Sequence, residues 1–589
     1  MAAVEAQNVQ KKASLIWGIA DILRGAYKEH EYGEIILPMT VIKRLHDTLL
    51  PTREVVIETA KTAPEALKGA MLTSASGYAF YNTSNFTFET LLADADHIED
   101  NFLDYLHGFS ENVQDVISRF KFEEKVAELA DPEVNALYEI IKKFNEPMAY
   151  FGADVVSTDE MGYVFEELTR RFSEAIGDGA GEHFTSRDIV ELMTDLLVIP
   201  DAEELINDNS AKTIYDQTMG TSQMLTVMQD RLRGLNANMS VQTFGQELNP
   251  VTYAIAKADT LIRGGNPDNM QYGDTLSNDK FSGYEFDYEI SNPPFGIDWK
   301  KEADAVTKEF EEQGFEGRFG AGLPKKSDGQ LLFMQNALSK LKKTGRMAIV
   351  QNGSSLISGN PGGGESGIRQ YLLENDYVDA IIQLPTDLFY NTSIATYIWL
   401  LSRTKSAERL GQVQLIDASN MFVKRRKNIG DKRVDISDED RSAIVKAYGE
   451  FEEKVYLANG KELTSKIYKN DFFGFTRVTV QTPKTDEHGN VVLDNKGKPL
   501  FNKELEDTED IPLSEDVDLY IEREVKPYNL RATLNRKKDK IGYEIPFTRL
   551  FYKYVEPESS SDIAERIQRL EEELVGNFEA LSGRDVKVD

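Results

Sequence analysis

The sequence predicts an α/β protein with a doubly wound, mostly parallel sheet, preceded by a helical N-terminal domain and followed by a C-terminal helical tail. Between residues 151 and 405, short apolar stretches of strand character alternate with segments of helical spacing, which is typical of a parallel sheet covered by helices. Before residue 151 the apolar residues recur at helical spacing, and short strand-like stretches are few. A chain of 589 residues is too long for one hydrophobic core, so several domains are expected.

The first predicted domain covers residues 1–150 and is helical. Its apolar residues recur at helical spacing in two early runs, and the segment 127–144 follows the same pattern. The residues of the two runs are Ile16, Ile19, Ala20, Ile22 and Leu23, and then Ile36, Leu37, Met39, Ile42, Leu45 and Leu49.

The second predicted domain covers residues 151–405 and contains the sheet. Helices are expected over 159–175, 187–197, 251–262 and 331–342. The expected strands lie near Thr213–Tyr215, Val241–Phe244, Tyr284–Ile290, Met347–Gln351, Val378–Gln383 and Thr396–Leu401.

The remaining chain divides into a mixed region, 406–556, and an amphipathic helix within 557–589. The mixed region has a polar, turn-rich segment at 482–509, predicted to be a loop or hairpin insertion. It also has two basic clusters, Lys424–Lys427 with Lys432 and Arg433, and Arg531 with Arg536, Lys537, Lys538 and Lys540. The apolar positions of the last helix are Ile563, Ile567, Leu570, Leu574, Phe578 and Leu581, and we expect them to dock on a partner or on the chain itself.

Composition excludes several classes of protein. The chain has no cysteine, so disulfides and thiolate metal sites are excluded, and its six histidines have no zinc-binding spacing, so no metal site is expected. No apolar window of membrane-spanning length and no signal-peptide core is found, so no membrane partner is expected. The absence of cysteine suits a cytoplasmic protein. The net charge of −32 has two interpretations. If the protein acts on DNA, another molecule supplies much of the binding to DNA. Alternatively, the acidic composition only keeps the protein soluble.

The tetrapeptide Asn292-Pro293-Pro294-Phe295 follows a predicted strand, at the edge where open α/β sheets place their sites. The Asn292 side-chain carbonyl and a nearby main-chain carbonyl can accept hydrogen bonds from an amino group on a flat ring. The two prolines stiffen the backbone, and Phe295 offers a face on which an extruded base can stack. The alternative is a Pro-Pro turn that merely ends a strand.

Four polar features precede this tetrapeptide. Gly181–Arg187 opens a helix, and Asp216–Gln223 forms a small-residue turn between a strand and a helix, although it lacks the lysine of a phosphate-binding loop. Glu247 can accept hydrogen bonds from ribose hydroxyls, and Asp274 can accept one from an adenine amino group. Each feature alone also fits an ordinary turn or surface acid, but one nucleoside-like ligand would satisfy all of them.

These motifs resemble the modification subunit of type I restriction–modification systems, a family of adenine-N6 DNA methyltransferases. The resemblance extends to residues 16–25, to Leu384-Pro385 with the block around Leu388–Ile394, and to Glu544–Arg549 with the terminal helix. It implies a Rossmann-like S-adenosylmethionine-dependent methyltransferase fold in 151–405. By this resemblance the catalytic residues are Asn292, Pro293, Pro294 and Phe295, and the cofactor-binding residues are Glu182, His183, Phe184, Thr185, Ser186, Arg187, Asp216, Gly220, Thr221, Ser222, Glu247 and Asp274.

The resemblance also implies partners. These are double-stranded DNA, a DNA-specificity subunit that binds two methyltransferase chains through the C-terminal tail, and a nuclease–translocase subunit that can join. The expected reaction is site-specific methylation of a flipped adenine at N6, with S-adenosyl-L-methionine as the methyl donor.

The chain departs from the family pattern at the cofactor turn and at residue 186 of the Gly181–Arg187 motif. Gln217 stands where the family has proline, Ser222 and Gln223 replace glycine or small residues, and Ser186 replaces another proline. If the turn requires a positive φ at 222, serine costs about 1 kcal/mol or more. Two alternatives therefore stay open: a catalytically weak or silent scaffold of the same complex, or a methyltransferase acting on another planar amino group, such as cytosine N4 or a protein glutamine.

Overall fold

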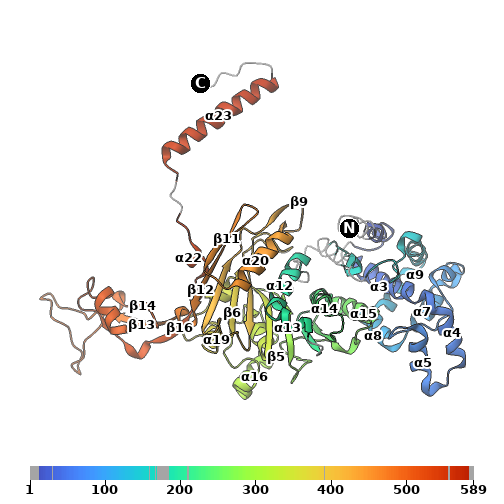
Figure 1. Cartoon of the computed structure of the whole chain (residues 1–589), viewed down its shortest axis with the longest axis horizontal. Coiled ribbons are helices and arrows are strands. Elements are labelled where there is room, and N and C mark those ends of the chain that lie inside the picture. Colours follow the sequence, from blue (N-terminus) through green and yellow to red (C-terminus); the bar gives the residue numbers. More distant parts are fainter. Residues whose placement is uncertain are drawn as a thin grey trace. The chain divides into compact units, whose positions relative to one another are not determined.

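The computed structural model describes residues 12, 14–28, 31–157, 160–162, 164–165, 167–168, 171, 185–207, 211–390, 392–554 and 558–582 (Figure 1). It divides into two compact units, Met1–Ile545 and Pro546–Asp589. Each unit is described by itself.

The N-terminal part of the first unit is helical, as predicted. Its apolar residues, including Leu45, Phe102 and Ile140, form one buried core, which Ile255 and Leu261 of a later helix, α15 (Pro250–Ile262), also join. The principal helices are α3 (Gly33–Leu49), α4 (Arg53–Thr62), α5 (Lys68–Ser76), α7 (Ile98–His107), α8 (Glu111–Arg119), α9 (Phe122–Ala130) and α10 (Leu137–Phe144). The helix predicted over 159–175 lies largely outside the described residues.

A ten-stranded sheet forms the centre of the first unit, in the order β11-β12-β8-β6-β7-β5-β4-β1-β2-β3. The pairs β3–β2, β2–β1, β1–β4, β4–β5 and β6–β8 are parallel, which confirms the α/β prediction. The strands are β1 (Lys212–Asp216), β2 (Val241–Glu247), β3 (Met270–Tyr272), β4 (Phe286–Ser291), β5 (Leu341–Asn352), β6 (Val378–Gln383), β7 (Thr396–Ser402), β8 (Gln412–Asp417), β11 (Lys454–Ala458) and β12 (Lys461–Lys469).

The structure differs from the predicted elements in several places. Helix α17 (Gln330–Ser339) is shorter than predicted, because Leu341 already begins the long strand β5. The sheet also continues past residue 405, where β8, β11 and β12 pair with one another and with β6, and α20 (Asp438–Glu450) contacts these strands.

The direction of the chain across the sheet reverses between β1 and β4. From β1 the chain moves outward through β2 to β3, and then crosses to β4 and β5 on the other side of β1. The carboxyl ends of β1 and β4 therefore diverge into loops on opposite sides, and ligands bind in the crevice at such a switch point. The helix α14 (Gln223–Leu235) begins beside this edge, directly after the turn that follows β1.

A second, smaller sheet lies toward the end of the first unit. It contains β13 (Gly474–Gln481), β14 (Asp507–Pro512), β15 (Thr533–Leu534) and β16 (Lys540–Tyr543). The turn-rich segment predicted as an insertion contains the isolated bridges Thr485–Val491 and Leu493–Pro499, so it folds back on itself between β13 and β14.

The second unit contains α22 (Phe547–Phe551) and the longer helix α23 (Ser560–Ser582). Ile563, Ile567, Leu570 and Leu574 of α23 have exposed fractions of 38–60%. Their spacing places them along one stripe of the helix, which agrees with the predicted amphipathic pattern. Across the described parts of both units, no helix combines the length and the apolar character needed to span a bilayer.

Candidate functional site

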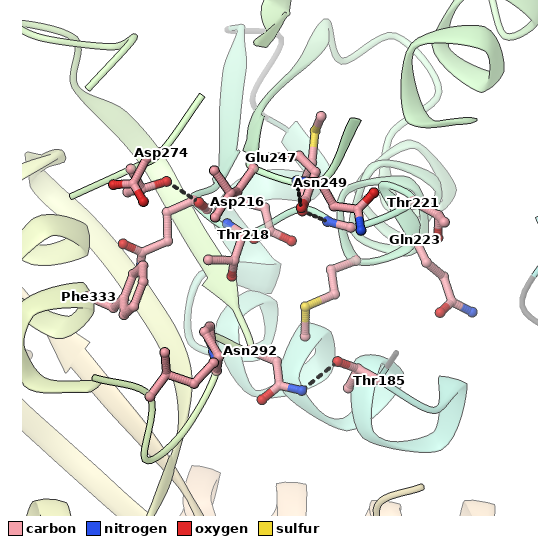
Figure 2. A pocket seen from close by; sticks show the side chains of 18 residues that line it. Thr185, Asp216, Thr218, Thr221, Gln223, Glu247, Asn249, Asp274, Asn292 and Phe333 are labelled. Atoms are coloured by element: carbon pink, nitrogen blue, oxygen red, sulfur yellow. Dashed lines mark hydrogen bonds between the residues drawn. The ribbon is translucent and has the colours of Figure 1, made fainter. Parts of the chain in front are cut away.

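A cavity of about 340 Å³ lies at the switch point, where the loops after β1, β2 and β4 meet (Figure 2). Most of the predicted site residues that the structure describes line it. The lining residues are Thr185, Asp216, Gln217, Thr218, Met219, Gly220, Thr221, Gln223, Met224, Glu247, Leu248, Asn249, Asp274, Thr275, Asn292, Pro294, Ile297 and Phe333.

Asn292 is the first residue after β4, and its side chain is held in one orientation. Its Nδ2 donates to Oγ1 of Thr185 over 2.9 Å, and Figure 2 shows the two side chains pointing toward each other. Its Oδ1 is buried and accepts no hydrogen bond from the described part of the chain. Because a buried acceptor without a donor is costly, this oxygen is suited to a ligand that brings an N–H group.

Asp216 ends β1 and also carries an unsatisfied buried oxygen in the cavity wall. Oδ1 accepts from the backbone N–H of Thr218 at 2.9 Å, whereas Oδ2 is buried and has no partner among the described residues. Burial raises the pKa of Asp216 to about 8, and the charge of Glu247 acts in the same direction. A carboxyl group in this position is poised to ionise when a cationic ligand comes near.

The turn after β1 lines the cavity, and the backbone N–H groups of residues 218, 219, 220 and 222 are hydrogen-bonded within the fold. Gly220 has a φ of 52° and Ser222 a φ of 73°, so the positive φ anticipated at residue 222 is present. The Ser222 side chain makes no capping hydrogen bond to α14 and is buried. A non-glycine residue in this conformation is strained, and strained backbone of this kind clusters at active sites and ligand-binding segments.

Glu247 ends β2 and fixes the turn to the neighbouring strand. Its Oε2 accepts from the backbone N–H of Gly220 at 2.8 Å, and its Oε1 accepts from the backbone N–H of Asn249 at 2.7 Å. Since each carboxylate oxygen has a second lone pair, Glu247 can hold the turn and also accept from a ligand hydroxyl.

Asp274 follows β3 and is also tied to its own loop. Oδ1 accepts from the backbone N–H groups of Leu276 and Ser277 at 2.8 and 2.7 Å. The neighbouring Thr275 donates from its hydroxyl to the carbonyl oxygen of Gln217 at 2.6 Å. These bonds hold Asp274 against the turn after β1 and leave its second oxygen for a ligand.

The other predicted residues differ in their relation to the cavity. Pro294 lines it and Pro293 is buried, whereas Phe295 packs edge-on against Phe389, with ring centroids 6.4 Å apart and an interplanar angle of 86°. The side chain of Arg187 bonds to Glu191 on the helix α12 (Arg187–Val198) instead of lining the cavity. The predicted cofactor residues Glu182, His183 and Phe184 lie outside the described residues.

Ser186, which stands where the resembling family has proline, is part of a buried network. Its hydroxyl donates to Asp188 at 2.5 Å and accepts from Nζ of Lys432 at 3.1 Å. Lys432 is 1% exposed and forms an ion pair with Asp188 at 3.1 Å. This serine therefore has a structural function that a proline could not provide.

Gln217, the other replacement of proline, forms a buried network under the cavity. Its Nε2 donates to Oε1 of Glu289 and to Oγ of Ser291, each at 3.1 Å, and its Oε1 accepts from Nδ2 of Asn336 at 2.8 Å. Ser291 directly precedes Asn292, so Gln217 links the turn after β1 to the end of β4. Burial raises the pKa of Glu289 well above its usual range, which favours its protonated form.

Sequence reasoning missed the apolar wall of the cavity. Met219, Met224, Leu248, Ile297 and Phe333 line it, and Leu248 keeps an exposed fraction of 59%. Phe333 comes from α17, far from the predicted motifs in the chain. Leu248 carried one usable signal, since it is a large apolar residue placed directly after the predicted ribose-binding acid.

The cavity suits a ligand that has three features: a flat ring with an amino group, several hydroxyl groups, and a positive charge. Apolar faces are offered by Leu248, Ile297 and Phe333, and acceptors by Asp216, Glu247, Asp274 and Asn292. An apolar cavity with a few convergent polar groups and a carboxyl of perturbed pKa is typical of a ligand site.

Two family models match the sequence. The model described as N-6 DNA Methylase matches residues 156–488, and the one described as HsdM N-terminal domain matches residues 12–144.

Curated relatives agree with this family. The methylase subunit of the type I restriction enzyme MjaIX from Methanocaldococcus jannaschii is 24% identical over 74% of this chain and 76% of its own length. The MpnII methylase subunit from Mycoplasma pneumoniae is 30% identical over 46% of this chain and 49% of its own length. The EcoKI methylase subunit from Escherichia coli is 27% identical over 51% of this chain and 55% of its own. The matches thus span about half of two of these three relatives.

A solved structure shares the fold. The methyltransferase subunit of a type I restriction–modification system from Streptococcus thermophilus superposes with a TM-score of 0.60 at 24% identity, covering 79% of this chain and 97% of that one.

Proposed function

This chain belongs to the N-6 DNA methylase family, and from that premise we propose that it transfers a methyl group from S-adenosylmethionine to the N6 amino group of adenine in double-stranded DNA. One observation carries the proposal. Asn292, at the end of β4, has its Nδ2 bound to Thr185, while its buried Oδ1 lacks a donor from the described chain. An exocyclic amino group supplies that donor.

The residues of the cavity fit the proposed methyl donor. When bound, S-adenosylmethionine supplies a methyl group activated by a positively charged sulfur. The buried Oδ2 of Asp216, which has no partner among the described residues, matches a cationic ligand, and Gly220 and Thr221 of the following turn line the same wall. Glu247 would accept from the ribose hydroxyls, Asp274 would accept from the adenine amino group, and Leu248 would cover the purine ring.

The chain's own residues account for orientation of the target. The base must leave the duplex, which costs a few kcal/mol. Asn292 Oδ1, with the main-chain carbonyl of Pro293, would hold the N6 hydrogens so that the nitrogen lone pair turns out of the ring plane. Phe295, fixed edge-on against Phe389, would offer its face to the base. Acceleration then comes from positioning and from stabilising developing charge.

The chain is proposed to act as one subunit of a cytoplasmic type I restriction–modification complex. Two methyltransferase chains would bind one DNA-specificity subunit, and a nuclease–translocase subunit can join them. Three observations support this: the relatives named as methylase subunits, the exposed apolar stripe of α23, and the net charge of −32, which disfavours an independent grip on DNA.

The rival functions make different products. The chain, co-purified with its specificity subunit, is incubated with duplex DNA and donor carrying a labelled methyl group, and the digested nucleosides are separated. We expect the label in N6-methyladenine. Label in N4-methylcytosine or in protein would replace the proposed substrate. Donor binding without any transfer would favour a silent scaffold.

A further inference from the structure

The hairpin of β9 (Val423–Ile429) and β10 (Lys432–Asp435) is the most basic segment near the site. It carries six lysines and arginines between residues 424 and 433, in a chain whose net charge is −32. The hairpin is antiparallel, and Figure 1 shows it extending beyond the edge of the large sheet.

Two of the six cations are used within the fold. Arg425 forms an ion pair with Asp435, and the buried Lys432 forms one with Asp188. The other four are exposed, and none of them forms an ion pair within the described ranges of the chain. These four, which we call the free cations of the hairpin, are Lys424, Arg426, Lys427 and Arg433.

The hairpin is bound to the segment that carries Phe389. The backbone N–H of Asp431 donates to the carbonyl oxygen of Tyr390 at 2.9 Å, and that of Arg433 donates to the carbonyl oxygen of Asp387 at 2.8 Å. At the tip, Gly430 has a φ of 55°, and a Cβ there would lie 2.5 Å from the Tyr390 carbonyl oxygen. The tip therefore packs closely against this segment.

Lys432 of the same hairpin contacts two segments that support the Asn292–Phe295 motif. Lys432 Nζ donates to the carbonyl oxygen of Leu388 at 3.0 Å and to Ser186 Oγ at 3.1 Å. Ser186 adjoins Thr185, which binds Asn292, and Leu388 adjoins Phe389, which packs on Phe295. The free cations thus lie on a hairpin that is bonded to the residues next to Thr185, which contacts Asn292, and next to Phe389, which contacts Phe295.

A fixed group of unpaired cations beside a base-binding site fits a phosphodiester backbone. Duplex DNA carries one negative charge for about every 1.7 Å of its axis, and each neutralised phosphate releases condensed counterions. The strong negative charge elsewhere on the chain repels DNA, so free cations at one place would also set where the backbone lies. Phosphate contacts position a protein on DNA without reading sequence.

We propose that the β9–β10 hairpin binds the DNA backbone beside the extruded adenine, through Lys424, Arg426, Lys427 and Arg433. The inference rests on the proposed function, since it places the DNA that this function requires. It assigns the hairpin to anchoring the duplex, and leaves sequence reading to another subunit.

The test replaces all four free cations by glutamine in the assembly with the specificity subunit. Binding to cognate and to unrelated duplexes is measured from 50 to 300 mM salt. We expect affinity at 100 mM salt to fall on the order of 100-fold for both duplexes, and the slope of log K against log salt to lose about 3.6, or about 0.9 for each contact. Replacing only Lys424 and Lys427 should reduce the slope by about half of that amount.

The matched control replaces four exposed lysines elsewhere, Lys61, Lys121, Lys142 and Lys446, by glutamine. It changes the net charge equally, and its slope should stay within about 0.5 of wild type. Unchanged S-adenosylmethionine binding shows that each variant is folded. If the wild-type assembly binds and methylates DNA and the hairpin variants do so equally well, this inference is wrong. If the wild-type assembly neither binds nor methylates DNA, the proposed function itself fails.

Discussion

Asn292 and Thr185 lie 107 positions apart in the sequence and are joined by a 2.9 Å hydrogen bond from the amide Nδ2 to the hydroxyl oxygen. This bond decides which end of the amide is left for a ligand. With Nδ2 engaged, the acceptor Oδ1 is the atom without a partner among the described residues. The orientation of the proposed catalytic amide is therefore set by a side chain on a different loop.

The first prediction concerns this orientation. Thr185→Val keeps the shape of the side chain but removes the hydroxyl, so Asn292 can rotate. We expect kcat to fall about 10–100-fold, with KM for DNA changed much less, because an aligned acceptor matters most in the transition state. Thr185→Ser should restore most of kcat. A valine variant with wild-type kcat would show that the bond has no role in positioning.

The second prediction uses the pKa of Asp216, which burial raises to about 8. A cationic ligand binds the ionised carboxylate, so its binding must release the proton that the free chain holds below this pH. We expect S-adenosylmethionine affinity, measured by calorimetry, to rise between pH 6 and pH 8 and to level off above it. Asp216→Asn should weaken binding and flatten the profile. A wild-type profile that is already flat would contradict the role.

The raised pKa of Asp216 affects the stability of the ligand-free chain in the opposite direction, because that stability falls as the pH rises. The folded-state pKa lies above the unfolded value, so the contribution of Asp216 is fully present below about pH 4 and is lost as the pH rises through about 8. Bound donor should therefore stabilise the chain more at pH 8 than at pH 6, as thermal unfolding with and without donor can measure.

The third prediction concerns Gln217. Gln217→Pro would match the family's usual turn, yet it removes the partners of Glu289, Ser291 and Asn336 inside the fold. We expect a loss of about 2–4 kcal/mol in the free energy of unfolding, because buried polar groups are left without partners. Gln217→Met should lose a similar amount without changing the backbone. Gln223→Met, at the first residue of α14, is the control and should change little.

The fourth prediction concerns Ser222, whose φ is 73°. Glycine adopts this conformation without strain, so Ser222→Gly should stabilise the turn by about 0.5–1.5 kcal/mol and tighten S-adenosylmethionine binding, or leave it no weaker. Lys121→Gly relieves a similar φ of 49° far from the cavity in sequence, and should leave donor binding unchanged. Several-fold weaker binding by Ser222→Gly would instead make the serine hydroxyl a ligand contact.

The fifth prediction concerns the second unit. Removing residues 557–589 deletes α23 with its exposed apolar stripe. We expect weaker assembly with the specificity subunit on gel filtration, and unchanged S-adenosylmethionine binding, since the cavity lies in the first unit. Replacing Ile567 and Leu570 by serine should have the same direction of effect, and replacing the exposed Glu571 and Glu572 should have none. An unchanged complex would place the tail elsewhere.

The sequence predicted the parts of the site that follow directly from strand ends. Asp216, Glu247 and Asn292 each come immediately at or after a strand of one parallel array, so their convergence follows from the alternation of strands and helices. Asp274 also lies in the cavity wall, although the three-residue strand β3 that precedes it was too short to give a periodic signal.

The rest depended on contacts between distant segments. The position of Phe333 in the cavity wall depends on how α17 crosses the sheet, and the Gln217–Asn336 bond joins residues 119 positions apart. Ser186, in the segment before α12, and Gln217, in the turn after β1, both departed from the family pattern. Local sequence could not show what these residues do, because their partners, Lys432 and Glu289, are distant in the chain. Local sequence also could not show that β8, β11 and β12 extend the sheet.

The central claim is tested most directly by Asn292→Ala. Methyl transfer to duplex DNA is measured in the assembly with its specificity subunit, and S-adenosylmethionine binding is measured by calorimetry on the same preparation. Asn238→Ala, at an exposed position, serves as the control. The account predicts a loss of about 10²–10³-fold in transfer, or about 2.7–4 kcal/mol, with donor affinity nearly unchanged. A variant that keeps more than about a tenth of wild-type methyl transfer would contradict the account, because removing an acceptor that acts in the transition state should reduce the rate by more than that.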